Sequence, residues 1–533
     1  MKIVQINTYD IQGGAARAAY RLHKGLREIG EDCRMLVRYK ASSDDSVYRI
    51  DARKDSAKLD EEFYLDQIQH CYIDCHRTDL SNTIFSLPYP GYDLSESALV
   101  QAADIINLHW VAWYQSLTTL HGLFSLGKPV VWTLHDQWAF TGGCHYSAGC
   151  DKYIRDCSSC PQLADDPFDL SAAILKDKIE LFKNVNLTVV TPSKWLAGCA
   201  GVSRLFKNVR VEVIPNSLEV DVFMPVPKAE AKQRLSLPED TITLLFGAHS
   251  GEEKRKGFGE LIGAITYCKS HPEFQKLLDE NKITVLCFGY PAKELTTIGI
   301  PIISLGYLDS EERVRDAYAA SDMFILPSLE DNLPNTMLEA LSCGTPVVAF
   351  DVGGIPDVVK DDVNGKLAPV KDTRLLAEAI LDLILNPEKS AAMGKNGRKQ
   401  IRDDYKLRVQ AQHYTALYKE VLDTTTKLQH DEIRHDNLDD VDKTVSAALY
   451  TSIGIHFKDI YEQVLFKSLK ESAPTLQRKW QECEADRAAR LDIIKRVNEQ
   501  LEICEKDRAA RLDVINALDA QVKGLQRFRR GGS

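Results

Sequence analysis

The chain has 533 residues, of which 44% are hydrophobic and 27% charged, and its formal net charge is −11. A single hydrophobic core does not grow to this length, so we expect two large domains and an additional segment. The negative net charge argues against a general nucleic-acid-binding protein, so no nucleic acid is expected as a partner.

The N-terminal sequence MKIVQINTYD begins directly with a strand-like apolar run. It lacks the apolar core of a signal peptide, and no segment of the chain approaches the roughly 20 apolar residues of a membrane span. We therefore expect a cytoplasmic protein with reduced thiols, and at most a peripheral contact with the inner membrane.

Apolar runs alternate with helical patterns over most of the chain. Predicted strands cover 2–7, 32–38, 105–110, 129–136, 187–193 and 211–216 in a first series, and 242–248, 283–290, 323–328 and 346–351 in a second. Strands of this kind form parallel sheets that are covered by helices on both faces. We therefore expect an α/β protein with two Rossmann-like, doubly wound domains that face each other across a cleft.

The predicted organisation follows from these two series. We expect two domains at 1–223 and 224–400, a closing amphipathic helix at 401–425, a charged linker with helices at 426–475, and a coiled coil at 476–528.

Two glycines and two histidines stand out at the ends of predicted strands in the first domain. Gly13 and Gly14 follow the first strand and allow the backbone to approach a ligand closely, and Arg17 lies one helical turn further on. His109 and His135 lie at the ends of two later strands. A histidine at a strand end more often makes local hydrogen bonds than takes part in catalysis. Both histidines are nevertheless candidates for lining a site.

Four cysteines lie close together after His135. Cys144, Cys150, Cys157 and Cys160 have the spacing C-x5-C-x6-C-x2-C, which fits a tetrahedral thiolate site for a structural Zn²⁺ ion. Four thiolates leave no open coordination position, so a catalytic zinc is not expected. The alternative is a set of reduced, half-buried thiols in a loop.

The segment PSLEDNLPNTMLEALSCGTPVVAF, residues 327–350, places carboxylates where a buried strand meets a helix. Pro334 is tolerated in a first helical turn because its missing N–H has no partner there. Ligands bind at the carboxyl ends of strands in parallel sheets, and a helix N-terminus favours a phosphate. Asp331 and Glu339 are placed to reach hydroxyl groups beside such an anion, as in a nucleotide diphosphate sugar. The residues alone leave open that both only complement the helix dipole.

The C-terminal segment contains an internal repeat. CEADRAARLDIIK at 483–495 recurs as CEKDRAARLDVIN at 504–516, an offset (504 − 483) of 21 residues or three heptads. This repeat predicts a coiled coil, through which the chain forms a homo-oligomer or binds a helical partner of its pathway. A single solvated helix is the alternative.

Residues 327–359, PSLEDNLPNTMLEALSCGTPVVAFDVGGIPDVV, resemble the signature of family 4 retaining glycosyltransferases of GT-B fold. The signature has an acid and a glutamate separated by seven residues, followed by Ala-x-x-x-Gly-x-Pro-Val-Val. Here the first acid is Asp331, where the family more often has Glu, and the second is Glu339. The Gly-Gly loop, IPNSLEVDVF and KRKGF agree in order, so the resemblance covers roughly residues 1–420.

The resemblance implies three catalytic candidates. The first acid of the family contacts the donor sugar, which assigns this contact to Asp331. Lys256 of KRKGF matches the lysine that neutralises the leaving diphosphate. His135 matches a histidine that reaches hydroxyl groups of the donor sugar.

The resemblance also implies a set of donor-binding residues. Glu339 holds the ribose hydroxyls, and the backbone amides of Asn335 and Thr336 bind the diphosphate. The family has an arginine several residues before the lysine, and His249 or Arg255 takes its place here. The remaining candidates are Gly13, Gly14, Arg17 and His109.

The function implied by the resemblance is retaining transfer of a sugar from a nucleotide diphosphate sugar to a glycan or lipid-linked glycan, without a catalytic metal, in bacterial surface polysaccharide synthesis. Two other functions remain open. One is a different enzyme on the same fold, such as a sugar-nucleotide epimerase, and the other is a coiled-coil assembly protein whose transferase part is inert.

Overall fold

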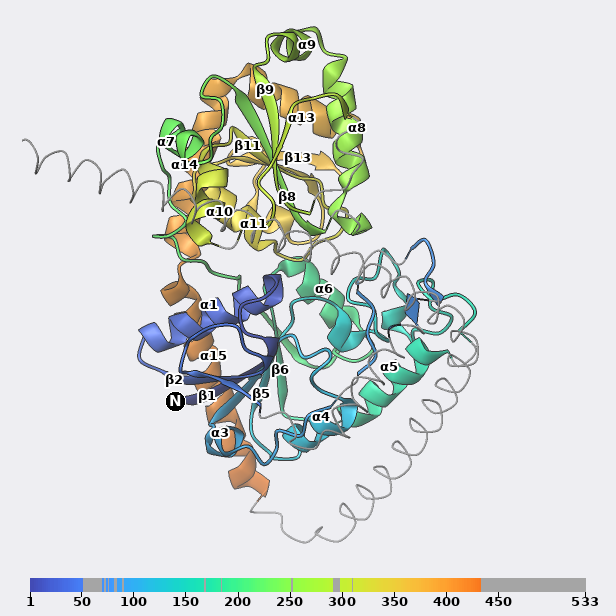
Figure 1. Ribbon diagram of the computed structural model, residues 1–533. Helices are drawn as coiled ribbons and strands as arrows, with labels where there is room; N and C mark the ends of the chain where they lie inside the picture. The colour runs from blue at the N-terminus through green and yellow to red at the C-terminus, as the bar shows by residue number, and fades with distance from the viewer. Residues whose placement is uncertain are drawn as a thin grey trace, which may run out of the picture. The chain divides into compact units, whose positions relative to one another are not determined.

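Two parallel β-sheets form the scaffold of the described part of the chain (Figure 1). The computed structural model describes residues 1–50, 70, 73–74, 76–80, 84–88, 91–166, 169–183, 185–250, 253–290, 298–308 and 310–432, with the side chains of 248–250, 290 and 426–432 excepted. All of them belong to the first of two compact units, Met1–Ile460 and Tyr461–Ser533. The predicted coiled coil at 476–528, and the predicted linker beyond residue 432, lie outside the described residues.

The first sheet has seven parallel strands in the order β3-β2-β1-β4-β5-β6-β7. The central strand β1 pairs on both sides, with Ile6 opposite Leu36 of β2 and Leu108 of β4. The strands are β1 Lys2–Tyr9, β2 Asp32–Tyr39, β3 Val47–Arg49, β4 Ile105–Leu108, β5 Val130–Thr133, β6 Leu187–Thr191 and β7 Arg210–Val213.

Helices cover both faces of this sheet, which is why its inner strands are continuous apolar runs. One face packs against residues of α4, α5 and α6, and the other against Leu22 and Leu26 of α1 and against α15. The helices of this part are α1 Gly14–Glu28, α3 Ala98–Ala102, α4 Leu117–Phe124, α5 Leu170–Leu181 and α6 Lys194–Val202, with short 3-10 turns η1 Trp138–Phe140 and η2 Lys152–Ile154.

The second sheet has six parallel strands in the order β10-β9-β8-β11-β12-β13. Its strands are β8 Ile242–Ser250, β9 Ile283–Tyr290, β10 Ile302–Ser304, β11 Met323–Leu326, β12 Val347–Asp351 and β13 Gly365–Pro369. Helices α7, α10, α11 and α14 contribute to the core on one face, and α8, α9 and α13 to the core on the other. Their bounds are α7 Lys228–Arg234, η3 Lys254–Lys256, α8 Phe258–Lys269, α9 Pro272–Asp279, α10 Glu311–Ala319, α11 Asn335–Ser342, α12 Ile355–Val358, α13 Thr373–Leu385 and α14 Pro387–Asp404.

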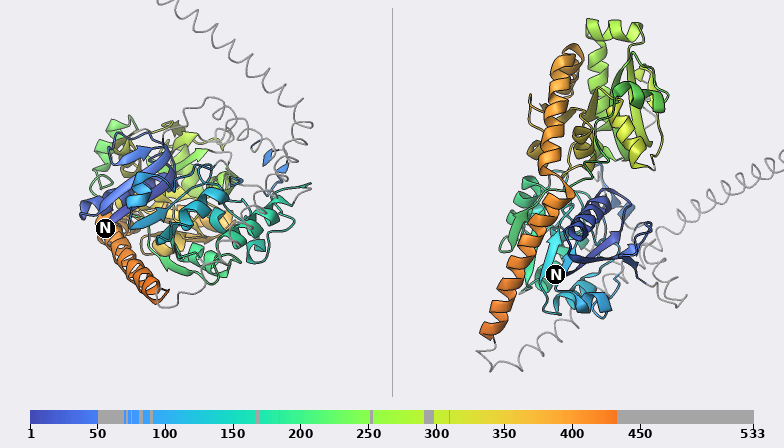
Figure 2. Two further views of the ribbon diagram at one scale, coloured as in Figure 1. Left: turned by 90° about the horizontal axis from the view of Figure 1, so that it is seen from below. Right: turned by 90° about the vertical axis from the view of Figure 1, so that its left-hand side faces the viewer.

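Helix α15, Leu407–Glu432, returns from the second domain to the first. It packs against α1, and Figure 1 and the right-hand view of Figure 2 show it running beside α1. Tyr418 donates a hydrogen bond to Asn107 Oδ1 at 2.8 Å, and the hydroxyls of Tyr414 and Thr133 lie 3.0 Å apart. The first domain is therefore completed by residues that follow the second domain in sequence.

The predicted fold class is confirmed: the chain is α/β, with two Rossmann-like parallel-sheet domains. Three short strands were not predicted, β3, β10 and β13. All three lie at sheet edges, where fewer side chains are buried and the apolar pattern is weaker. Within the part of the chain that the structure describes, no helix combines the length and apolarity needed to span a membrane.

The prediction of one continuous closing helix is wrong, because the chain leaves the helical conformation between Asp404 and Leu407. The carbonyl oxygen of Tyr405 accepts a hydrogen bond from the N–H of Leu218 at 3.0 Å, and Lys406 forms a β-bridge with Leu218. Pairing with the segment between the domains replaces helical hydrogen bonding there.

We predict that Gly257→Ala strongly destabilises the protein, whereas Gly259→Ala does not. Gly257 has φ 72°, and a Cβ atom there would lie 1.7 Å from the Pro327 carbonyl oxygen. A Cβ at Gly259, two residues on in α8, meets no heavy atom within 4 Å. Chemical denaturation should show a loss of at least about 2 kcal/mol for the first variant and a gain of roughly 0.5–1 kcal/mol for the second. Equal stabilities would contradict this local geometry.

Candidate donor-sugar site

Lys256 and Asp331 form an ion pair at the carboxyl end of β11. The Lys256 ammonium lies 2.7 Å from Asp331 Oδ2, and the Asp331 side chain is only 7% exposed whereas that of Lys256 is 23% exposed. Ser328 donates a hydrogen bond to the same oxygen at 3.3 Å, and the Asn332 N–H donates to Oδ1 at 3.1 Å. Both oxygens of the Asp331 carboxylate therefore already have donors from the protein.

Arg255 adds a second positive charge beside Asp331. Its Nη1 atom lies 3.4 Å from Asp331 Oδ2, and its guanidinium lies 4.3 Å from the ring centroid of Tyr146 in the first domain. Burial alone would raise the pKa of Asp331, but the charges of Lys256 and Arg255 lower it. Asp331 is therefore ionised at neutral pH, with the charges of Lys256 and Arg255 beside it.

Glu330 lies next to this ion pair. Its Oε2 atom accepts a hydrogen bond from the Ala148 N–H at 3.0 Å, and burial raises its pKa. The loop that follows β11 is thus held against the cysteine-containing loop of the first domain.

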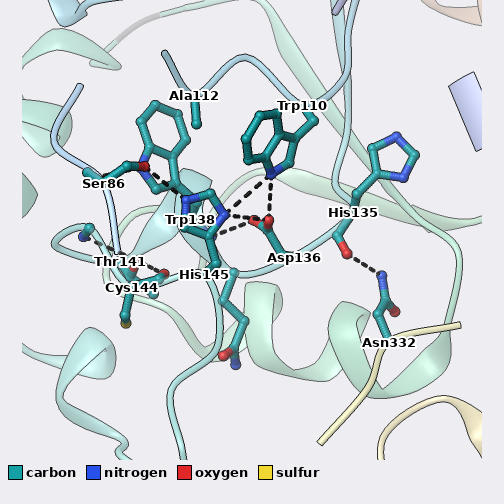
Figure 3. Close-up of polar contacts among 12 residues, drawn as sticks. Ser86, Trp110, Ala112, His135, Asp136, Trp138, Thr141, Cys144, His145 and Asn332 are labelled. Atoms are coloured by element: carbon teal, nitrogen blue, oxygen red, sulfur yellow. Dashed lines mark hydrogen bonds and ion pairs between the residues drawn. The ribbon is translucent and has the colours of Figure 1, made fainter. Parts of the chain in front are cut away.

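Asn332 connects the same loop to two further elements of the first domain. Its Nδ2 donates to the His135 carbonyl oxygen at 3.0 Å, a contact drawn in Figure 3, and its Oδ1 accepts from the Ser193 hydroxyl at 2.6 Å. Gly353 and Gly354 lie against this backbone: Cβ atoms there would come within 1.8 Å and 1.9 Å of the carbonyl oxygens of residues 331 and 332. These two glycines belong to DVGGIPDVV, the last part of the segment that resembles the family signature, and this resemblance could have indicated them from the sequence.

The N-terminus of α11 lies next to the Gly-Gly loop. Asn335 Nδ2 donates a hydrogen bond to the Gly14 carbonyl oxygen at 2.9 Å, while Gly13 has φ 93° and precedes α1. Pro334 precedes the first helical residue rather than standing within the first turn as predicted. Asn335 and Thr336 are both half-buried, and their N–H groups, like those of any first helical turn, have no intrahelical acceptor.

Glu339 is bound by an arginine that sequence reasoning missed. Arg21 of α1 donates from Nη2 to Glu339 Oε1 at 2.9 Å and from Nε to Glu219 Oε2 at 2.8 Å. Its side chain is 2% exposed. Tyr318 also donates to Glu339, at 3.4 Å. Arg21 lies one helical turn after Arg17, so the helix that follows the Gly-Gly loop could have indicated a second candidate arginine. Only contacts between distant parts of the chain show which of the two arginines is buried.

The two predicted histidines contact each other. His109 Nδ1 and His135 Nε2 are 3.1 Å apart, and the His109 Nε2 is 3.1 Å from Gln5 Nε2. His109 is 2% exposed whereas His135 is half-buried. The structure therefore places His109 behind His135, as a support for that ring rather than as a group that lines the site.

A buried network that the sequence did not reveal follows His135 (Figure 3). Asp136 Oδ2 lies 2.6 Å from His145 Nδ1 and accepts a hydrogen bond from Trp110 Nε1 at 2.7 Å, and His145 Nε2 lies 2.8 Å from the Ser86 hydroxyl. Burial would raise the pKa of Asp136, but His145 and its other hydrogen-bond donors lower it. Because Ser86 is fully buried, this Ser-His-Asp chain positions the loop and exposes no nucleophile.

The four cysteines do not form a ready-made metal cluster. Among the described residues, no group of three or more His, Cys, Asp or Glu side chains is arranged to hold a metal ion. All four nevertheless line the same small cavity.

Of the other predicted residues, Arg17 is half-buried, with its charge acting on Glu311 and Tyr318. His249 lies in β8 with a side chain outside the described set.

Comparison with known proteins finds a family match over the second domain. Residues 229–400 match the family model described as Glycosyl transferases group 1. A D-inositol 3-phosphate glycosyltransferase of Thermobispora bispora is 30% identical over 196 residues, which is 34% of this chain and 44% of that protein. An alpha-maltose-1-phosphate synthase of Mycolicibacterium smegmatis is 25% identical over 228 residues, 40% of this chain and 57% of that protein. The chain thus spans about half the length of these curated relatives.

Solved structures share the fold over most of the chain. A sucrose-phosphate synthase from Thermosynechococcus elongatus has a TM-score of 0.55 at 18% identity and covers 79% of this chain and 99% of its own. HepE of Anabaena, in complex with UDP-glucose, has a TM-score of 0.54 at 16% identity and covers 79% of this chain and 100% of its own. Residues 229–400 therefore match the group 1 glycosyl transferase model, and the chain shares its two-domain GT-B fold with these solved structures.

We predict that Arg21→Met destabilises the protein by about 3–5 kcal/mol, because it leaves the buried Glu339 carboxylate without its cation and Glu219 with Lys24 alone. Arg210→Met serves as the control, since Arg210 pairs with Glu420 on the surface and exposed pairs contribute little. Chemical denaturation of both variants measures the difference. A similar loss for the two would contradict the role of Arg21.

We also predict that stability falls as the pH falls from about 6.5 to about 4. Burial lowers the pKa of His135 from 6.5 to about 4, so on acidification the unfolded chain binds a proton before the folded protein does. This residue contributes a slope of at most about 1.4 kcal/mol per pH unit. For His135→Gln, the free energy of unfolding, measured by chemical denaturation at several pH values, should fall less steeply as the pH is lowered across this range. An unchanged slope would contradict the assignment.

Proposed function

We propose that this protein is a family 4 glycosyltransferase that moves a sugar, with retention of configuration, from a nucleotide diphosphate sugar to a glycan or lipid-linked glycan. The observation that carries this proposal is the Lys256–Asp331 ion pair of 2.7 Å at the end of β11. Beside it stands the N-terminus of α11, which the Gly14 carbonyl contacts from the first domain.

The leaving diphosphate is the group that this site is suited to stabilise. A lysine ammonium has three donors, and one of those of Lys256 is used by Asp331. The other two are available for phosphate oxygens, together with the first N–H groups of α11 and the positive end of its dipole. Donors that are already oriented before the reaction stabilise a charge that develops in the transition state by several kcal/mol.

Asp331 has a different role in this proposal from the sugar contact that the resemblance implied. Its oxygens form an ion pair with Lys256 and accept hydrogen bonds from the Ser328 hydroxyl and the Asn332 N–H. Its side chain is also one methylene shorter than the family's usual Glu. We assign it the role of a positioning residue that holds the Lys256 ammonium toward the diphosphate.

Glu339 is assigned to the ribose hydroxyls. Arg21 occupies one of its oxygens and fixes the side chain, and a carboxylate retains further lone pairs for hydroxyl donors. In the reaction, the bond from the anomeric carbon to the diphosphate breaks while the acceptor oxygen bonds to the same face. The released phosphate oxygen takes the acceptor's proton, so the step requires no protein base.

The acceptor is the least constrained part of the proposal. A surface glycan follows from the sequence resemblance, whereas two relatives are named for inositol 3-phosphate and maltose 1-phosphate. Acceptor assays therefore include both small phosphates and lipid-linked oligosaccharides.

Isomerisation of a sugar nucleotide without transfer would favour an epimerase, and donor binding without turnover would favour an inert transferase domain. The oligomer proposed from the repeat at 483–516 is tested by the mass of the full chain in solution.

We predict that Lys256→Ala lowers the rate of sugar transfer by roughly 10²–10³, the usual loss for one transition-state donor. Lys254→Ala is a matched control, because Lys254 lies two residues away with a side chain that is 61% exposed. Release of UDP from UDP-glucose, with and without acceptor, measures the rate. Parental activity in a folded Lys256→Ala variant would refute the proposed site.

We further predict that nucleoside diphosphates raise the melting temperature selectively. A ligand at 100 times its Kd stabilises the folded state by about 2.7 kcal/mol. UDP, GDP and ADP, each alone and as its glucose conjugate, are compared with the corresponding monophosphates. Glu339→Gln should reduce the shift. No shift with any diphosphate at millimolar concentration would count against a donor site.

A further inference from the structure

The four cysteines of the loop after β5 surround one cavity, although 16 residues (160 − 144) separate the first from the last. The cavity is lined by Cys144, Cys150, Cys157 and Cys160, and its volume of about 10 Å³ is close to the space that a single water molecule occupies. Cys144 and Cys157 are buried, and Cys150 and Cys160 are half-buried. None of the described residues that line this cavity is a carboxylate or a histidine.

A backbone N–H group points at one of the four sulfur atoms. The N–H of Lys152 donates to Cys150 Sγ at 3.5 Å. A donor of this kind favours a sulfur that carries negative charge.

A buried lysine lies beneath the same loop. Lys178 of α5 is fully buried, and its Nζ donates to the carbonyl oxygens of Trp138 at 2.5 Å and Thr141 at 2.9 Å. Both of these acceptors are neutral. Burial lowers the pKa of Lys178, whereas the nearby acidic groups Cys157, Cys144 and Asp136 raise it. Because a buried ammonium is costly without a compensating charge, negative charge on the cysteine sulfurs would stabilise the ammonium form of Lys178.

We propose that Cys144, Cys150, Cys157 and Cys160 bind one Zn²⁺ ion as a structural tetrathiolate site. Zn²⁺ prefers four thiolates in a tetrahedron with Zn–S distances of about 2.3 Å. The described residues contain no group already in that arrangement, so binding draws the four sulfurs inward around the cavity that they share. Each thiol releases its proton to solvent on binding, and the resulting site carries a net charge of about −2 next to Lys178.

The zinc site would fix a loop that contacts the second domain. Ala148 lies between two of the cysteines and donates its N–H to Glu330, and the ring of Tyr146 lies under the Arg255 guanidinium. Three non-glycine residues of this loop, Ala148, Cys157 and Ser159, have positive φ angles of 52°, 58° and 49°. Such conformations persist where the surrounding structure holds them, and four metal–sulfur bonds do so. The proposal does not depend on the proposed glycosyltransferase activity.

The direct test is the metal content of the full chain, purified without chelator, exposed to one equivalent of ZnCl₂ and desalted. Mass spectrometry of the metal should find about one zinc per chain. Cys150→Ser and Cys160→Ser, which replace half-buried sulfurs, should lose it, whereas Cys199→Ser should retain it because Cys199 is half-buried but does not line the cavity. Zinc retained at the parental level in folded Cys150→Ser and Cys160→Ser would overturn the proposal, as would a parent without zinc.

A second measurement on the unaltered chain applies where a cysteine variant does not fold. Co²⁺ added to the zinc-free protein should give thiolate-to-metal charge-transfer absorption and the intense visible bands of a tetrahedral site, and Zn²⁺ should abolish both. Zinc should also raise the melting temperature and protect four thiols from a thiol reagent. Weak octahedral Co²⁺ spectra without charge transfer, or zinc binding that leaves every thiol reactive, would show an adventitious ion only and overturn the assignment.

Discussion

The buried guanidinium of Arg21 is the interaction on which the arrangement of the candidate donor site depends. It comes from the helix after the Gly-Gly loop, and it contacts Glu219 in the segment between the domains and Glu339 in α11 of the second domain. Burial would raise the pKa of Glu219, but Arg21 and Lys24 lower it, so the ionised Glu219 carboxylate compensates the charge of Arg21. A buried charge set of this kind tolerates little displacement, because separating any partner leaves an unpaired charge in a poorly solvated place.

Around this contact, the loops at the carboxyl ends of both sheets meet. Asn332 contacts Ser193 and the His135 carbonyl, and Asn335 contacts Gly14. The same geometry leaves few exposed charged groups at the candidate site. Asp331 is surrounded by donors from the protein, and Lys256 is the cation whose remaining donors face a ligand in our proposal. The chemistry assigned to the site is therefore electrostatic stabilisation by groups that the fold has already oriented.

The cysteine loop belongs to the same functional unit. Its backbone holds Glu330, its Tyr146 ring supports Arg255, and the Asp136–His145–Ser86 network anchors its beginning. The loop contains no strand or long helix among its described residues, and it is held by internal hydrogen bonds such as those from the N–H of Gln137 to the His145 carbonyl and from the N–H of Cys157 to the Lys152 carbonyl. Side-chain networks and, in our proposal, a metal ion add to that constraint. The stability of the loop and the position of Arg255 are then coupled properties.

The sequence by itself determined the α/β class and the inner strands, because buried parallel strands are continuous apolar runs. It also placed Asp331 and Glu339 after one of these strands, whereas Lys256 was implied only by the family resemblance. It did not determine the edge strands β3 and β10, whose side chains are largely exposed or half-buried, nor the break at Tyr405, which depends on pairing with Leu218. Only the tertiary structure decided that Arg21 rather than Arg17 binds Glu339, that His109 stands behind His135, and that Lys178 lies beneath the cysteines. These are contacts between residues far apart in the chain, and local periodicity carries no information about which distant side chains share a buried space.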